Sequence, residues 1–322
     1  MTNLYGAQRR TASALLSLAL AASGASGASA DDLTIENLTN TKGLALLNAE
    51  DLAKAKPLPG VEVTPKQLEE MRQRFRTLNP NSLDLKAVPG KEGTLLKGVP
   101  EKVDDPSAAA PYWSTGRLVF RDGDGDLSAC TAQFVEGASV ILTAAHCVMD
   151  EHTGKWFSNF TFQRAYNDGQ TAQTVGWRCV SLFDAFHTPA PNYAYDYAFI
   201  LADGEDDKAP LELATGTPAS TALTAIGYPA NFGDGRFLYK VDGEWAAISG
   251  GIVTMQGNPM RSGNSGGAWF TDFKVDGGIG ENRVISLNSH HVVGNTQDEN
   301  GPLFTVDTNR LLTHVRDAKC LD

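Results

Sequence analysis

The sequence predicts an all-β domain that begins near Tyr112 and ends at the C-terminus. One observation supports the fold class, and two others support the division of the chain. After Tyr112, short runs of β-branched and aromatic residues alternate with turns of Gly, Asn, Asp and Pro, which is typical of an all-β sandwich or barrel. An apolar stretch followed by small residues opens the chain, and a stretch rich in Pro, Gly, Lys and Asp precedes the change in texture. The chain therefore divides into residues 1–30, 31–110 and 111–322.

The composition bounds the class of protein. The chain has 322 residues, 42% of them hydrophobic, and a formal net charge of -11. These values are typical of a soluble globular protein with one or two domains plus processing segments. Because nucleic-acid phosphates require a basic face, the acidic balance argues against a nucleic-acid partner.

Residues 1–30 have the three regions of a signal peptide. Arg9 and Arg10 supply positive charge, an apolar stretch runs from Ala12 to Ala22, and Ala28-Ser29-Ala30 is a small-x-small cleavage site. The apolar stretch is shorter than the roughly 20 residues that span a bilayer, so we expect no stable membrane insertion. We predict cleavage after Ala30 and a secreted protein, extracellular or periplasmic. The alternative is a disordered Ala/Ser tail.

Residues 31–110 contain no cysteine and few aromatic residues. Thr64, followed by Pro65 and then by acidic residues, has the pattern of a helix start, and we expect this helix to end near Thr77. The stretch 87–111 has the composition of a linker. We interpret 31–110 as a propeptide and linker. The alternative is a helical extension that stays in the mature protein.

The segment 111–322 is predicted to consist of short strands and one closing helix. Leu311, Leu312 and Val315 recur at helical spacing, which predicts a helix over Thr308–Ala318. The expected strands are Arg117–Arg121, Leu127–Val135, Ser139–Thr143, Phe160–Ala165, Gln173–Leu182, Tyr197–Leu201, Ala222–Ile226, Glu244–Val253, Gly267–Phe270 and Arg283–Ser289.

Export would permit disulfides between the four cysteines of the chain. Four cysteines allow three pairings, and the residues alone leave these open. No two cysteines form a CxxC pair, which argues against zinc. The cysteines are Cys130, Cys147, Cys179 and Cys320.

Three segments carry residues suited to nucleophilic catalysis. His146 follows a β-branched, apolar strand and two alanines, and a neutral His is the usual general base for a hydroxyl near pH 7. Asp196 opens the apolar run that follows it, where a buried carboxylate can fix the tautomer of a His ring. Asp184 is a second candidate for the acid, and we expect it to cap a turn.

The third segment is Gly263-Asn264-Ser265-Gly266-Gly267. Glycines around Ser265 permit a tight bend that can aim the amides of Gly263 and Ser265 at one point as an oxyanion hole. Such a turn is weak support alone, but the chain order His, Asp, Ser is the one used by chymotrypsin-type enzymes.

Residues from about 112 to 322 resemble the chymotrypsin-like (trypsin-like) serine endopeptidases, most of all their bacterial glutamyl-endopeptidase-like branch. Thr143-Ala144-Ala145-His146-Cys147 matches the histidine motif of the family at every position. Gly263–Gly267 matches the serine motif of this branch, which has Asn where trypsin has Asp. The resemblance does not cover the first 110 residues or so.

The resemblance implies two antiparallel β-barrels of six strands each, with a cleft between them that binds peptide. His146 and Asp196 would lie on the first barrel and Ser265 on the second. It also implies a Cys130–Cys147 disulfide, which leaves Cys179 and Cys320 as the remaining pair. The implied activity is peptide hydrolysis through an acyl-enzyme, without a metal or organic cofactor.

The same resemblance places four residues in the substrate pocket. Pro259 would form its floor, six residues before Ser265, and because Pro is not acidic a preference for Lys or Arg is unsupported. The wall would include Asn288, Ser289 and His290. Glutamyl endopeptidases place a His at the position of Asn288, so a preference for acidic residues would need a protonated His290 or its neighbour His291.

Asn264 bears on activation. In trypsin-type zymogens an Asp at this position pairs with a newly cut N-terminal ammonium, and an Asn has no charge for that switch. We therefore hypothesise that the propeptide of a zymogen masks the cleft or aids folding. It follows that a chain beginning at Asp31 should cleave substrates more slowly than one beginning near Tyr112.

Three other interpretations remain open. The serine segment also fits the Gly-x-Ser-x-Gly elbow of α/β-hydrolase esterases, which requires a strand before the Ser and a helix after it. A catalytically inactive homologue that only binds partners is the second. The alternating acids of Asp122–Asp126 resemble a calcium loop but lack its distal Glu, so a hairpin turn is expected there. We expect protein or peptide substrates as partners and a monomer.

Overall fold

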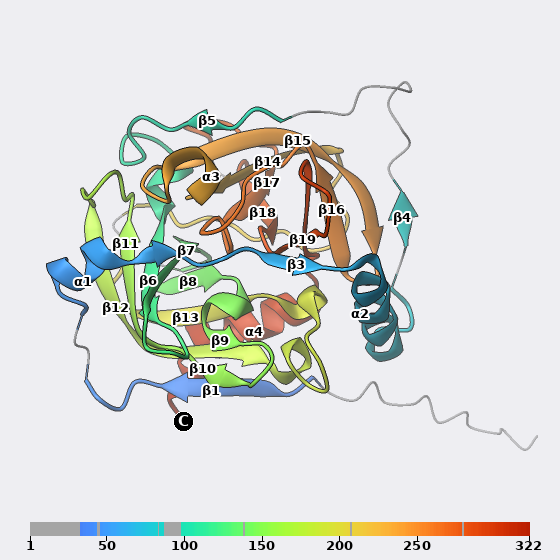
Figure 1. Cartoon of the computed structure of the whole chain (residues 1–322), viewed down its shortest axis with the longest axis horizontal. Helices are drawn as coiled ribbons and strands as arrows, with labels where there is room; N and C mark the ends of the chain where they lie inside the picture. Colours follow the sequence, from blue (N-terminus) through green and yellow to red (C-terminus); the bar gives the residue numbers. More distant parts are fainter. Residues whose placement is uncertain are drawn as a thin grey trace, which may run out of the picture. The chain divides into compact units, whose positions relative to one another are not determined.

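The computed structural model describes residues 33–43, 46–82, 84–86, 98–137, 139–206, 208–278 and 280–322. The predicted signal peptide lies outside the described residues. Within them, no helix is both long and apolar enough to cross a membrane. Two antiparallel sheets make up the region after Tyr112, and the preceding segment adds strands to both of them (Figure 1).

The first sheet closes into a barrel of six antiparallel strands. Their order is β12-β11-β6-β7-β8-β13, and a further pairing between β12 and β13 completes the circle. Phe120, Phe134, Phe162 and Phe199 are fully buried in the core of this half. The strands are β6 (Thr115–Arg121), β7 (Leu127–Phe134), β8 (Val140–Thr143), β11 (Ser158–Arg164), β12 (Gln173–Phe183) and β13 (Ala198–Asp203).

The second sheet contains six further antiparallel strands in the order β18-β17-β14-β15-β16-β20. The two end strands of this sheet, β18 and β20, approach each other. The amide of Phe304, which follows β20, donates to the carbonyl of Ile285 in β18 at 3.2 Å. Trp269 and Ile285 lie in its separate core. The strands are β14 (Ala222–Gly227), β15 (Tyr239–Ser249), β16 (Ile252–Gln256), β17 (Ala268–Thr271), β18 (Arg283–Leu287) and β20 (Asp298–Pro302).

Smaller elements complete the region after Tyr112. The closing helix α4 spans Val306–Arg316, two residues upstream of the predicted bounds, because Thr305 caps it with a capping box. The short strand β19 (His290–Val292) pairs with β20. The remaining elements are β9 (Met149–Asp150), β10 (Lys155–Trp156) and α3 (Ala230–Gly233).

One predicted strand is wrong and one predicted hairpin is confirmed. The run Glu244–Val253 is divided between β15 and β16, since Gly250 and Gly251 turn the chain with φ of 54° and 75°. Residues 122–126 form the hairpin turn between β6 and β7. There the Asp122 carboxylate accepts the amides of Asp124 and Asp126.

The segment before Tyr112 adds short strands to both sheets. Helix α2 (Pro65–Leu78) begins at Thr64 with a capping box, as predicted, and buries Leu68, Met71 and Phe75. The two-residue and three-residue strands of this segment have no periodic pattern, and the sequence did not predict them. The other elements are β1 (Ile35–Thr39), α1 (Ala49–Lys54), β2 (Lys56–Pro57), β3 (Val61–Val63), β4 (Leu85–Lys86) and β5 (Glu101–Lys102).

Candidate active site

His146 is positioned by the end of β8. The strand stops at Thr143, and the short 3-10 helix Ala145–Cys147 carries the His ring away from the barrel wall. Ala144 and Ala145 are completely buried, so larger side chains could not be accommodated at this turn.

Asp196 is positioned at the start of β13. It follows the 3-10 helix Tyr193–Tyr195 and is fully buried. Its carboxylate accepts the backbone amide of His146 at 2.9 Å, and its Oδ2 lies 2.8 Å from Nδ1 of the same ring. The acid therefore orients the ring through two contacts. Asp184 instead begins a 3-10 helix, and its backbone carbonyl accepts the amide of His187.

The serine loop Gly263–Gly267 is held by both sheets. From the first barrel, the Thr131 backbone amide donates to the Ser265 carbonyl at 2.9 Å, and the Thr131 hydroxyl donates to the Gly263 carbonyl at 2.8 Å. From the second sheet, the Gly266 amide donates to the Asn288 carbonyl at 2.8 Å. Gly263 and Gly266 have φ of 75° and 85°, a region that favours glycine. Hydrogen bonds from both halves of the fold therefore position the loop.

Ser265 lies beside the turn that carries His146. The disulfide sulfur of Cys147 is 3.8 Å from the Ser265 carbonyl oxygen. Nε2 of His146 is buried and makes no hydrogen bond within the described residues, so the Ser265 hydroxyl is not bonded to it in this structure. Catalytic hydrogen bonds are often formed only once substrate is bound.

The charges of the His–Asp pair reinforce each other. Burial opposes protonation of His146, but the Asp196 carboxylate outweighs it and raises the pKa of the ring above its ordinary value. Burial likewise opposes ionisation of Asp196, yet His146 and Ser289 hold the pKa of that carboxyl below its usual range. The pair can therefore stabilise an imidazolium during proton transfer.

Ser289 was predicted to line the substrate pocket, and the structure gives it a contact with the acid. Its hydroxyl donates to Oδ2 of Asp196 at 2.5 Å and lies 2.9 Å from Nδ1 of His290. This contact joins the second sheet to the acid of the first barrel. No sequence pattern predicts this contact, because the two residues are 93 positions apart.

The other predicted pocket residues differ in environment. Asn288 is fully buried and accepts the indole N–H of Trp269 at 2.6 Å. Pro259 is half-buried, and its carbonyl accepts the Asn231 amide at 2.9 Å. Burial lowers the pKa of His290 and of His291 to about 3. Neither imidazole is therefore a cation near neutral pH in this state.

A buried carboxyl that the sequence did not predict lies behind the serine loop. The Asn264 side chain donates to both oxygens of Glu299, at 3.1 and 2.9 Å. Burial raises the pKa of Glu299 well above its ordinary value. Asn264 thus has an internal partner that needs no new N-terminus.

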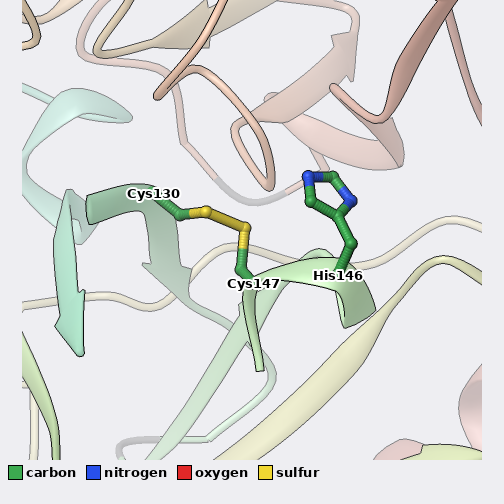
Figure 2. A group of neighbouring side chains, drawn as sticks. All are labelled: Cys130, His146 and Cys147. Carbon is green, nitrogen blue, oxygen red and sulfur yellow. A yellow bond between two sulfur atoms is a disulfide. The ribbon is translucent and has the colours of Figure 1, made fainter. Parts of the chain in front are cut away.

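Cys130, His146 and Cys147 form a cluster whose potential ligand atoms lie within 4.8 Å of one another (Figure 2). Both sulfurs are joined in a disulfide, and Nδ1 of the ring faces Asp196. These atoms are therefore not available to a metal ion. A second disulfide joins Cys179 to Cys320. The Cys130–Cys147 pairing is the one that the resemblance implies, and Cys179–Cys320 is the pair that this left over.

The serine segment is not the elbow of an α/β-hydrolase. After Ser265 the chain enters strand β17 at Ala268 rather than a helix. The elbow requires a strand–Ser–helix order. The esterase interpretation therefore lacks its structural basis.

Comparison with known proteins gives matches in structure only. No protein-family profile and no curated protein matches the sequence. The solved structure of the protease Anisep from Arthrobacter nicotinovorans is 21% identical, with a TM-score of 0.54, and the match covers 64% of this chain and 94% of that one. A Glu endopeptidase in complex with MPD is 18% identical, with a TM-score of 0.56, covering 72% and 100%.

A thermostable serine protease from an extremophilic microorganism is similar at 23% identity and a TM-score of 0.53, covering 63% and 96%. These identities are too low to establish more than the fold. The closed first barrel, the second antiparallel sheet and the C-terminal helix nevertheless agree with it. The chain has the chymotrypsin-like fold.

Proposed function

We propose that the chain is a secreted serine endopeptidase. The observation that carries the proposal is the buried His146–Asp196 pair at 2.8 Å beside a serine loop that is hydrogen-bonded to both halves of the fold. A signal peptide over residues 1–30 and a propeptide over 31–110 are part of the proposal. Two disulfides are consistent with an oxidising compartment.

The proposed reaction is acyl transfer to water. His146 takes the Ser265 proton as the hydroxyl oxygen attacks the peptide carbonyl, and Asp196 stabilises the imidazolium. The amides of Gly263 and Ser265 stabilise the oxyanion. His146 then protonates the leaving amine, and water hydrolyses the acyl-enzyme. A preference for acidic residues before the cut has no support from the neutral His290 and His291.

The test is mass spectrometry of a casein digest, with Ser265→Ala as the inactive variant. Ser220→Ala is the matched control, because Ser220 is exposed. The secreted chain and a chain beginning near residue 111 are both assayed. Cuts that depend on Ser265 establish the endopeptidase, and the residues before each cut define its specificity. Absence of cuts from both chains would favour the second candidate, an inactive homologue that binds partners.

A further inference from the structure

We propose that residues 56–63 are an inhibitory strap that occupies the substrate cleft and keeps the uncut chain latent. The inference rests on the proposed function, because it concerns access to the same site. The strap lies between α1 and α2, in the segment that we interpret as a propeptide.

The strap pairs with both halves of the fold. Pro57 lies in parallel register with Ala129 of the first barrel. Val61 lies in parallel register with His290 of the second sheet, and the Val293 amide donates to the Val63 carbonyl at 2.9 Å. In Figure 1 the blue strand β3 crosses the view between the strands of the two sheets. One short segment therefore bridges the two halves on the side of the serine loop.

The centre of the strap contacts the proposed oxyanion hole. The Leu58 carbonyl accepts the amide of Gly263 at 2.9 Å, and the Leu58 amide donates to the Ala129 carbonyl at 2.8 Å. A carbonyl of the chain itself thus uses one of the two N–H groups that the proposed reaction reserves for the oxyanion. While this bond persists, that donor is not free for a substrate carbonyl.

The next residues press directly on the serine loop. The Gly60 amide donates to the Ser262 hydroxyl at 3.0 Å. A Cβ at Gly60 would lie 3.3 Å from the Ser262 backbone nitrogen, and one at Gly263 would lie 2.8 Å from the Pro57 side chain. A side chain at Gly60 would therefore crowd the backbone that leads into the serine loop.

Burial of the reactive groups agrees with a closed cleft. His146 and Ser265 are each 2% exposed, and Asp196 is 0% exposed. A peptide must reach the hydroxyl, the ring nitrogen and the Gly263 amide, so a strap bonded to that amide has to leave before catalysis.

The strap is anchored by the helix that follows it. The Arg74 guanidinium of α2 donates to the Pro191 carbonyl at 2.5 Å, and the Phe75 ring lies 5.4 Å from the ring of Tyr195. Tyr195 immediately precedes Asp196 in the chain. Pro57 and Pro59 restrict the backbone on either side of Leu58, which lowers the entropic cost of holding it extended. The peptide bond between Leu58 and Pro59 joins the Leu58 carbonyl to the imide nitrogen of the proline ring.

The experiment uses the full secreted chain and two independent readouts. The first is the rate at which a small organofluorophosphate labels Ser265, followed by intact mass. The second is amide hydrogen exchange of peptides covering residues 56–63 and 263–265. The strap variant is Gly60→Leu. The matched control is Gly278→Leu, because a Cβ at Gly278 meets nothing within 4 Å.

In the wild type we expect slow labelling and protected amides in both peptides. Gly60→Leu should label at least about tenfold faster and lose protection in both peptides, because its side chain crowds Ser262 and displaces the hydrogen bonds between the strap and the serine loop. Gly278→Leu should behave as the wild type, and Ser265→Ala should not label. Val61→Pro, which removes a strap amide hydrogen, provides a second variant should Gly60→Leu fail to fold.

The outcomes separate the two proposals. Rapid labelling of the wild type, unchanged in both strap variants, would overturn the strap and leave the endopeptidase standing. Unprotected amides at residues 56–63 in the wild type would also overturn it. A strap that is protected in the wild type and released in the variants, with Ser265 unlabelled in every form, would support its docking and refute the endopeptidase.

Discussion

Replacing Asp196 by Asn is the most informative single substitution at the candidate site. One carboxylate oxygen accepts the His146 backbone amide at 2.9 Å, and the other faces Nδ1 at 2.8 Å. A backbone N–H can only donate, so it selects the amide oxygen of Asn at the first position. The Asn NH₂ then faces Nδ1, which must become an acceptor, and the ring proton moves to Nε2. His146 can no longer take a proton from Ser265.

The magnitude follows from the same distance. At 2.8 Å, the attraction between a carboxylate and an imidazolium is about 6 kcal/mol at an effective dielectric constant of about 20. Since about 1.36 kcal/mol corresponds to a tenfold change in rate, we expect kcat to fall about 10,000-fold. The same substitution has an effect of about this size in serine proteases with this triad.

The assay is the kcat for a peptide amide substrate cut in the casein experiment. Ser220→Ala is assayed in parallel, and circular dichroism confirms that each variant is folded. A folded Asp196→Asn protein that retains more than a tenth of the wild-type kcat would refute the assignment of Asp196 as the orienting acid.

Three further predictions follow from the electrostatics and packing. The pKa of His146 is raised above its ordinary value of 6.5, so kcat/KM should fall as pH falls through a value above 6.5; an acid limb below 6.5 would contradict the role of Asp196. Burial raises the pKa of Glu299 in the folded state above its value in the unfolded chain. The neutral carboxyl therefore stabilises the fold fully below the unfolded-state pKa, and this stabilisation is lost as pH rises towards the folded-state pKa. Glu299→Gln should therefore become more stable relative to the wild type between pH 5 and pH 7 in urea unfolding, and a constant difference would argue against a neutral carboxyl. Gly266→Ala should lower the free energy of unfolding by about 3 kcal/mol or more, since a Cβ there would collide with the Thr131 carbonyl and the Thr143 hydroxyl at a φ of +85°. Thermal unfolding of the variant checks this prediction. Gly278→Ala is the control, and its free energy of unfolding should change by no more than about 0.5 kcal/mol.

The sequence determined the features that depend on local pattern. Runs of β-branched and aromatic residues between turns of Gly, Asn, Asp and Pro predicted nine of the barrel strands to within a few residues, because both signals act locally along the chain. The Thr64–Pro65 start predicted α2 because the cap and the missing N–H act within one helical turn. His146 and Ser265 were identified because glycine and small residues must surround them locally, and the structure places them as adjacent segments.

The tertiary structure decided everything that depends on distant partners. Ser289 donates to an acid on the other half of the fold, and Glu299 meets Asn264 across 35 positions. The predicted single strand over 244–253 is two strands because the two glycines adopt positive φ, which residue type permits but does not require. The short strands of the strap have no periodicity of their own. Their conformation comes from backbone hydrogen bonds to strands formed by other parts of the chain, and pairing of that kind leaves no pattern in side-chain polarity.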